Sequence, residues 1–172
     1  MHAEKVCKIK GGIPMVNGRK LTEAIVVFNR NVKASELNEV ANGFYGKVVV
    51  TKKLIVDKAL DIECDLYVLG DVVRKNPISE YAIKVNGDFS CYGDMHCNTI
   101  YVGGSFFCEG IIYSKSITVC EDFVCYDKVD AYGSNITVAG DFEAFAVKAD
   151  SIIVMNSISV YGSISARCVK AG

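Results

Sequence analysis

The chain has 172 residues, with 19 Lys and Arg against 20 Asp and Glu, so its formal net charge is −1. This balance gives no electrostatic reason to expect nucleic acid or an anionic membrane as a partner. Hydrophobic residues make up 51% of the sequence, but they occur in short alternating runs, and none approaches the ~20 continuous apolar residues of a membrane span. We therefore expect one domain with a single core and no transmembrane segment.

The N-terminus and the cysteines indicate the cellular compartment. Residues 1–7 (MHAEKVC) contain no long apolar stretch of the kind found in a secretory signal. We therefore expect a cytoplasmic location, where the eight cysteines stay reduced and behave as small hydrophobic residues. The alternative, a secreted form whose signal has been removed, stays open.

Residues 1–47 differ from the rest of the chain and are predicted to form an N-terminal cap. Asn17-Gly18 is a turn signal typical of a hairpin. Residues 34–43 read as a short helix, with Ser35 as its N-cap and Gly43 as its stop. The remaining residues, 48–172, are predicted to form one continuous repeat domain.

A repeat of about 17 residues is the dominant feature of this second region. Its clearest copies are residues 83–89 (IKVNGDF), 100–106 (IYVGGSF), 117–123 (ITVCEDF) and 136–142 (ITVAGDF). A fixed period of this length predicts a solenoid, in which each repeat is one coil and neighbouring coils bury one another.

Each coil contains three pairs of apolar residues, and the two members of a pair are two positions apart. Such alternation is typical of a short strand with both members facing inward. Three strands per coil predict an all-β, single-stranded parallel β-helix with a triangular cross-section. In the coil that begins at residue 83 the pairs are Ile83/Val85, Phe89/Cys91 and Met95/Cys97. About eight coils are expected, with first inward residues at positions 25, 48, 66, 83, 100, 117, 136 and 152.

Glycine and aspartate recur where the chain must turn between sides. Each of these glycines comes two positions after an inward valine, and we expect a positive φ there. The aspartates follow directly, and we expect their side chains to accept backbone N–H groups. The pairs are Gly70-Asp71, Gly87-Asp88 and Gly140-Asp141, with Gly104-Ser105 and Glu121-Asp122 as variants.

Three cysteines are candidates for a metal site. Cys91, Cys108 and Cys125 are separated by 17 residues each and are expected to stack inside the rod, where soft metals prefer thiolates. The equivalent position in a later coil is Ala144, which favours a constraint on size over a metal. Calcium on Asp88, Asp122 and Asp141 is the corresponding alternative for the corner carboxylates, and turn capping is the favoured interpretation. We expect neither metal nor cofactor.

Catalytic motifs are scarce. His2 and His96 are the only histidines, whereas solenoid acyltransferases use a catalytic histidine and solenoid carbonic anhydrases need three. His96 is expected to face outward, and an enzyme that uses it with corner aspartates is a minor hypothesis. No Ser-His-Asp arrangement or nucleotide-binding motif is visible. A non-enzymatic protein is therefore expected.

Four outward tyrosines form a candidate interaction surface for sugars or a protein partner: Tyr67, Tyr92, Tyr101 and Tyr126. The preference of tyrosine for strands explains them equally well.

The coil pattern I-x-V-x-G-D-F-x-C of residues 83–91 resembles that of the bactofilins, polymer-forming bacterial proteins with repeated aliphatic-x-Val-x-Gly elements. The resemblance covers residues 48–172. It implies a right-handed triangular β-helix and a cytoskeletal scaffold that polymerises end to end without nucleotide. Two features depart from the family pattern, because residues 1–47 look structured where bactofilins have short disordered tails, and the chain is unusually rich in Phe and Cys.

Val169 and Ala171 begin the last coil and are the candidate assembly end, because an uncovered strand edge can pair with another subunit. The leading hypothesis is a structural, self-assembling solenoid, with a homo-oligomer or another protein as its partner. The alternative is a module that binds a ligand or protein on the tyrosine-bearing face.

Overall fold

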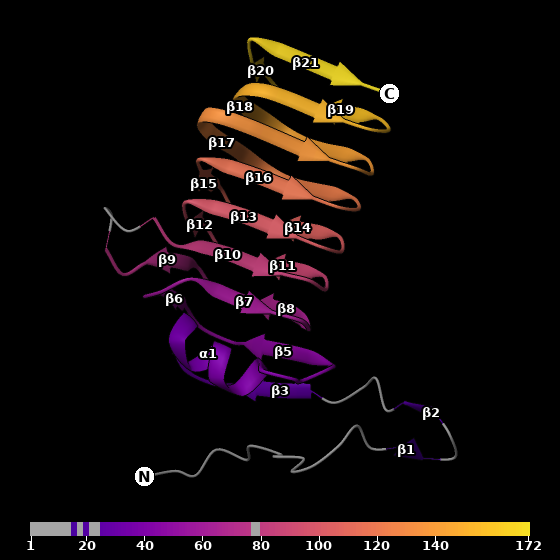
Figure 1. Ribbon diagram of the computed structural model, residues 1–172. Coiled ribbons are helices and arrows are strands. Elements are labelled where there is room, and N and C mark those ends of the chain that lie inside the picture. The colour runs from indigo at the N-terminus through magenta and orange to yellow at the C-terminus, as the bar shows by residue number, and fades with distance from the viewer. Residues whose placement is uncertain (1–14, 17–18, 21–24, 77–79) are drawn as a thin grey trace.

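A computed structural model describes residues 15–16, 19–20, 25–76 and 80–172. Nearly all of its strands are parallel and stack coil upon coil into one β-solenoid (Figure 1). The predicted fold class is therefore confirmed. In the described residues about seven turns have strands on all three sides. A further coil at the N-terminal end is built from two strands and a helix, which accounts for the difference from the eight coils expected.

The strands form three rows, here called sides A, B and C. Side A contains β3 (Ile25–Phe28), β5 (Lys47–Val50), β8 (Asp65–Val68), β11 (Phe89–Cys91), β14 (Phe106–Cys108), the first parts of β17 (Phe123–Val138) and β18 (Phe142–Val154), and β19 (Ile158–Val160). Side B contains β4 (Val32–Lys33), β6 (Leu54–Val56), β9 (Val72–Arg74), β12 (Met95–His96), β15 (Ile112–Ser114), the middle of β17 and β18, and β20 (Ile164–Ser165). Side C contains α1 (Ala34–Ala41), β7 (Leu60–Ile62), β10 (Ala82–Val85), β13 (Thr99–Val102), β16 (Ser116–Val119), the last parts of β17 and β18, and β21 (Cys168–Ala171).

The core consists of ladders of equivalent inward residues. On side A four buried phenylalanine rings stack in consecutive coils, with centroids 5.2, 4.8 and 4.9 Å apart. These rings belong to Phe89, Phe106, Phe123 and Phe142. Parallel strands in register lie ~4.8 Å apart, and this spacing suits stacked aromatic rings. The inward pairs predicted between residues 83 and 154 are therefore confirmed as the interior of the rod.

Before residue 83 the predicted rows are wrong by one side. Leu60, and not Leu66, pairs with Ile83, while Leu66 pairs with Phe89. The reason is the loop between β9 and β10, which lengthens this coil and so moves the frame by one strand. Gly70 and Asp71 consequently belong to the corner between sides A and B.

The predicted orientation of β3 is also wrong. Val26 and Phe28 face the core, whereas Ile25 and Val27 are exposed. All four residues are apolar, so alternation cannot select the inward face, and a shift of one residue exchanges the two faces of a strand.

The corner glycines do not have the positive φ that was expected. Positive φ near 70° occurs at Gly43 (70°) and Gly133 (74°), and at none of the corner glycines Gly70, Gly87, Gly104 and Gly140. Crowding between coils explains them instead. A Cβ at Gly104 would collide with Oδ1 of Asp88 in the preceding coil. The same carboxylate oxygen accepts the Ser105 amide at 2.9 Å, so the predicted role of the aspartates as acceptors is confirmed.

The N-terminal segment contains the expected helix and part of the expected hairpin. Strands β1 (Met15–Val16) and β2 (Arg19–Lys20) pair antiparallel, and the Asn17-Gly18 turn lies outside the described residues. Helix α1 starts one residue before Ser35, with Lys33 at its N-cap and no side-chain cap. The predicted N-cap is therefore wrong. The Ser35 amide and hydroxyl instead donate to Asp57 of the next coil, at 3.0 and 2.8 Å.

Helix α1 buries Ala34, Leu37 and Ala41 and packs against β7, so it takes the place of a side C strand in the first coil. Partial burial opposes ionisation of Asp57, but the hydrogen bonds from Ser35 outweigh it and lower the pKa of this carboxyl. No helix in the described part of the chain is long and apolar enough to cross a membrane.

Candidate interaction surfaces

The cysteine ladder on side A lies inside the rod. Cys91, Cys108 and Cys125 are buried in consecutive coils and pair in register. Their thiols donate to backbone carbonyl groups at the corner, for example Cys108 to Gly110 at 3.4 Å. Hydrogen bonds to the Cys125 and Cys91 thiols, together with burial, raise the pKa of Cys108. Their burial and their stacking in register support the interpretation of these three cysteines as core residues.

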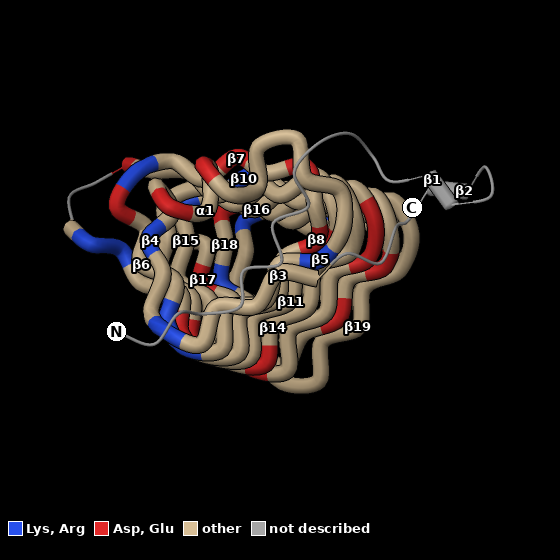
Figure 2. The backbone as a smooth tube through the Cα atoms, turned by 90° about the horizontal axis from the view of Figure 1, so that it is seen from below, with Lys and Arg blue, Asp and Glu red and all other residues tan. Residues whose placement is uncertain are grey.

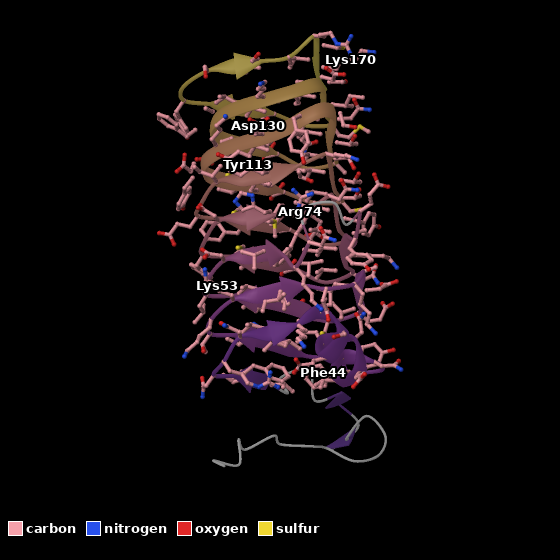
Figure 3. All side chains as sticks on the ribbon, turned by 90° about the vertical axis from the view of Figure 1, so that its left-hand side faces the viewer. Phe44, Lys53, Arg74, Tyr113, Asp130 and Lys170 are labelled. Atoms are coloured by element: carbon pink, nitrogen blue, oxygen red, sulfur yellow. The ribbon has the colours of Figure 1, made fainter. Side chains whose placement is uncertain are left out.

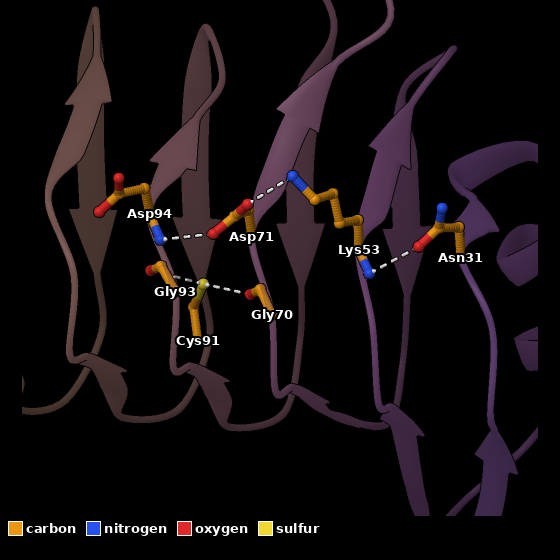
Figure 4. A network of polar contacts seen from close by, with 7 residues as sticks. All are labelled: Asn31, Lys53, Gly70, Asp71, Cys91, Gly93 and Asp94. Atoms are coloured by element: carbon orange, nitrogen blue, oxygen red, sulfur yellow. Dashed lines mark hydrogen bonds and ion pairs between the residues drawn. The ribbon is translucent and has the colours of Figure 1, made fainter.

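The corner between sides A and B illustrates how coils are joined by polar contacts (Figure 4). The Asp94 amide donates to Oδ1 of Asp71 at 3.3 Å, and Lys53 Nζ lies 2.8 Å from Oδ2 of Asp71. The Lys53 amide in turn donates to the Asn31 side chain at 3.2 Å. The hydrogen bond from Lys53 is the main cause that lowers the pKa of Asp71. These carboxylates hold backbone groups, and among the described residues no three His, Cys, Asp or Glu are grouped to hold a metal ion.

His96 lies on side B and its ring stacks on Tyr113 in the next coil, with centroids 4.7 Å apart. Tyr113 and Asp130 are seen on this side of the rod in Figure 3. Asp130 pairs with Lys128 at 3.0 Å through Oδ2, while its buried Oδ1 has no protein partner.

Near β20 a shallow open hollow of about 270 Å³ is lined by residues that include the Asp150–Arg167 ion pair. Neither Asp130 nor this hollow assembles a catalytic group.

The structure places three of the four candidate tyrosines on side A or at its edge, and the fourth on another side. Tyr67 lies on side A, and Tyr92 and Tyr126 lie at the edge of side A where β11 and the first part of β17 end. Tyr101 lies on side C, where it pairs in register with Lys84 and Thr118. The Cys120 thiol donates to the Tyr101 hydroxyl at 3.4 Å.

Further aromatic residues that the sequence reasoning missed extend this edge. We define the aromatic stripe as Tyr92, Phe107, Tyr126, Phe145 and Tyr161. Four of its side chains are largely exposed, with exposed fractions of 43% for Tyr92, 63% for Tyr126, 55% for Phe145 and 72% for Tyr161. Phe107 is half-buried and connects two of them, with ring centroids 5.5 Å from Tyr92 and 5.2 Å from Tyr126. A shared place in the repeat, directly after the second inward residue of side A, would have identified all but Phe107.

The surroundings of the aromatic stripe are predominantly acidic. Side A and its corners in five coils comprise residues 86–94, 103–111, 120–128, 139–146 and 155–163. These segments contain one basic residue, Lys128, which pairs with Asp130, and eight carboxylates: Asp88, Asp94, Glu109, Glu121, Asp122, Asp127, Asp141 and Glu143. Red segments without blue ones mark the edge of the tube near β19 in Figure 2. One carboxylate also touches the stripe, because the Tyr161 hydroxyl donates to Glu143 at 3.1 Å, which raises the pKa of Tyr161.

The coil formed by β19, β20 and β21 presents its inward face to solvent. Ile164 and Val169 are each 46% exposed, whereas the residues in the same rows one coil earlier, Val147 and Ile152, are buried. Val169 and Ala171, the candidate assembly residues, lie in β21 and pair with β18 along one edge. Among the described strands, β19, β20 and β21 each pair with β18 alone.

No protein-family model, curated protein or solved structure matches the chain. The resemblance to bactofilins therefore rests on the repeat pattern and on the β-solenoid architecture that the structure shares with the prediction.

Proposed function

We propose that this protein is a non-enzymatic structural solenoid that associates with a second copy of itself through the coil β19–β21. The exposed apolar inward face of that coil is the observation that supports the proposal. Its inward positions hold the same residue types that form the core in every preceding coil. Covering them with another subunit removes apolar surface from water, and the free strand edge offers backbone groups for pairing.

End-to-end association of this kind agrees with the scaffold role that the bactofilin resemblance implies. Repeat architectures suit it, because each coil contacts only its neighbours and a second subunit can continue the stack. A closed contact between two equivalent ends gives a dimer, whereas a head-to-tail contact gives a filament. Both outcomes bury Ile164 and Val169.

Sedimentation velocity over a wide range of protein concentration tests this proposal. The wild-type chain is expected to shift to larger species as its concentration rises, and negative-stain images are expected to show rods longer than one molecule. Ile164→Lys and Val169→Glu are expected to give monomers. Ser165→Lys changes an exposed residue in the same coil and is the matched control, expected to behave as wild type. A wild-type chain that stays monomeric at every concentration contradicts the proposal.

The second candidate function is binding of a partner on the outer surface, and the exposed aromatic stripe supports it. Exposed aromatic clusters are enriched at binding surfaces. Tyr126→Ser removes one exposed ring and is expected to weaken partner binding several-fold while it leaves sedimentation unchanged. Tyr101→Ser, on side C, is the control that is expected to retain binding.

A further inference from the structure

We propose that the aromatic stripe and its carboxylates bind an arginine-rich polypeptide segment of a partner protein. This inference rests on the second candidate function, binding on the outer surface, and specifies the chemistry of the partner. It does not depend on self-association through the coil β19–β21.

The rings provide the first part of the argument. Successive coils lie ~4.8 Å apart, so the stripe runs along the rod as a ladder of aromatic groups. Tyr92, Phe107 and Tyr126 form a continuous surface, with centroid separations of 5.5 and 5.2 Å. A planar guanidinium group stacks on such rings through both cation–π attraction and surface contact.

The charge around the rings selects the partner. Eight carboxylates and one basic residue, Lys128, occur in the five segments of side A and its corners, and Lys128 is paired with Asp130. Phosphate groups and anionic lipids would be repelled there, whereas a cationic chain is attracted. Within the same five coils the other sides differ, because lysines occur in their strands, for example Lys148 on side B and Lys170 on side C. On side A itself a lysine lies in an earlier coil, where Lys47 contacts the Tyr67 ring.

The corner carboxylates are also fixed in position. At the edge of side A that carries the stripe, Oδ1 of Asp94 accepts the Ile111 amide at 2.9 Å. At the opposite edge, Oδ1 of Asp88 accepts the Ser105 amide at 2.9 Å, and Oδ1 of Asp141 accepts the Ser157 amide at 3.0 Å and its hydroxyl at 2.7 Å. The second oxygen of each group takes part in none of these bonds. Carboxylates that are already ordered lose little entropy on binding, and they suit the directional N–H groups of arginine.

A direct test uses a fluorescent dodecapeptide of alternating Arg and Gly, with the matched Lys-Gly peptide beside it, and measures binding to the full chain by fluorescence anisotropy. We expect saturable binding of the Arg peptide that weakens as salt is added. The Lys peptide is expected to bind several-fold more weakly, because lysine stacks less well on aromatic rings.

Variants then locate the site. The double variant Tyr126→Ser/Tyr161→Ser is expected to lose about tenfold in affinity, since two cation–π contacts are removed. Both side chains are largely exposed, so the fold is expected to survive, which circular dichroism checks. Glu109→Gln/Glu143→Gln is expected to lose a similar amount. The matched controls, Tyr101→Ser and Asp61→Asn on side C, are expected to bind as wild type.

Three results would overturn the inference. One is the absence of Arg-peptide binding at low salt. Another is equal binding of the Arg and Lys peptides with no effect of the stripe variants, which indicates only general attraction between charges. The third is binding of a neutral probe, cellohexaose, without binding of the Arg peptide, which would retain the outer binding surface but assign it a different ligand. Sedimentation of the same proteins separates each result from failure of self-association.

Discussion

Replacing Phe106 by alanine tests the account of the core most directly. Phe106 is buried on side A and stacks on Phe89 and on Phe123, with centroids 5.2 and 4.8 Å away. Truncating a buried phenylalanine costs about 3–5 kcal/mol. Each lost aromatic pair is worth about 0.5–1.5 kcal/mol beyond burial, so we expect a value near the top of that range. Typical domains have only about 5–15 kcal/mol of stability in total, so Phe106→Ala should lower the urea midpoint strongly.

Phe145→Ala is the matched control, because it removes the same side chain from an exposed position on side A. It should change the free energy of unfolding by about 0.5 kcal/mol or less. Urea titrations followed by circular dichroism give both values. If Phe106→Ala costs no more than Phe145→Ala, the stacked phenylalanine ladder does not stabilise the rod as argued here.

Three further predictions concern the corners and the thiols. Gly104→Ala should destabilise the chain by about 2 kcal/mol. The loss should be smaller in an Asp88→Ala background, because the colliding carboxylate is gone. A double-mutant cycle by urea titration measures the coupling between Gly104 and Asp88, and simple additivity would contradict the steric explanation. The hydrogen bonds from Ser157 lower the pKa of Asp141. Its contribution to the free energy of unfolding is therefore present above the unfolded pKa of about 3.9 and is lost as the pH falls through the folded pKa. Asp141→Asn should lose stability less steeply on acidification, and an unchanged pH dependence would refute this role. Among the described cysteines, Cys120 and Cys168 are exposed and should be alkylated fast in the folded protein, as mapped by mass spectrometry, whereas fast labelling of any buried cysteine would show that the interior is open.

The two proposed surfaces differ in what they use. The coil β19–β21 offers apolar side chains and a free strand edge, which suit a continuing solenoid. The aromatic stripe offers rings within an acidic surface along the length of the rod. A scaffold with both would form an assembly through its ends and recruit a partner along its sides.

Sequence patterns predicted the rod well where copies of the repeat are similar. From Ile83 to Val154 the inward pairs, the stacked phenylalanines and the buried cysteines all lie where alternation and period placed them. The prediction was wrong by one side before Ile83, because the loop before β10 lengthens one coil without changing the hydrophobic alternation of the strands around it. It was wrong for β3 because Ile25–Phe28 is apolar on both faces.

The role of the corner glycines depends on how one coil packs on the next. Gly87, Gly104 and Gly140 were predicted to be turn residues with positive φ, whereas a Cβ at each would collide with a carboxylate of the preceding coil. At Gly70 the colliding group is the backbone carbonyl of Lys52. These contacts join residues of different coils, and local turn rules consider only neighbouring residues.

The interior of this protein follows from its sequence because burial imposes the same alternation and the same period on every coil. The arrangement of the outer surface does not follow from the sequence, since burial does not constrain solvent-facing positions. Which exposed side chains lie together depends on which coils are neighbours. Tyr92, Tyr126 and Tyr161 are far apart in the chain, and stacking in register places them along one edge. The same stacking moves Tyr101 to another side. The repeat therefore predicted the fold, whereas the candidate binding surface depends on the three-dimensional register of the coils.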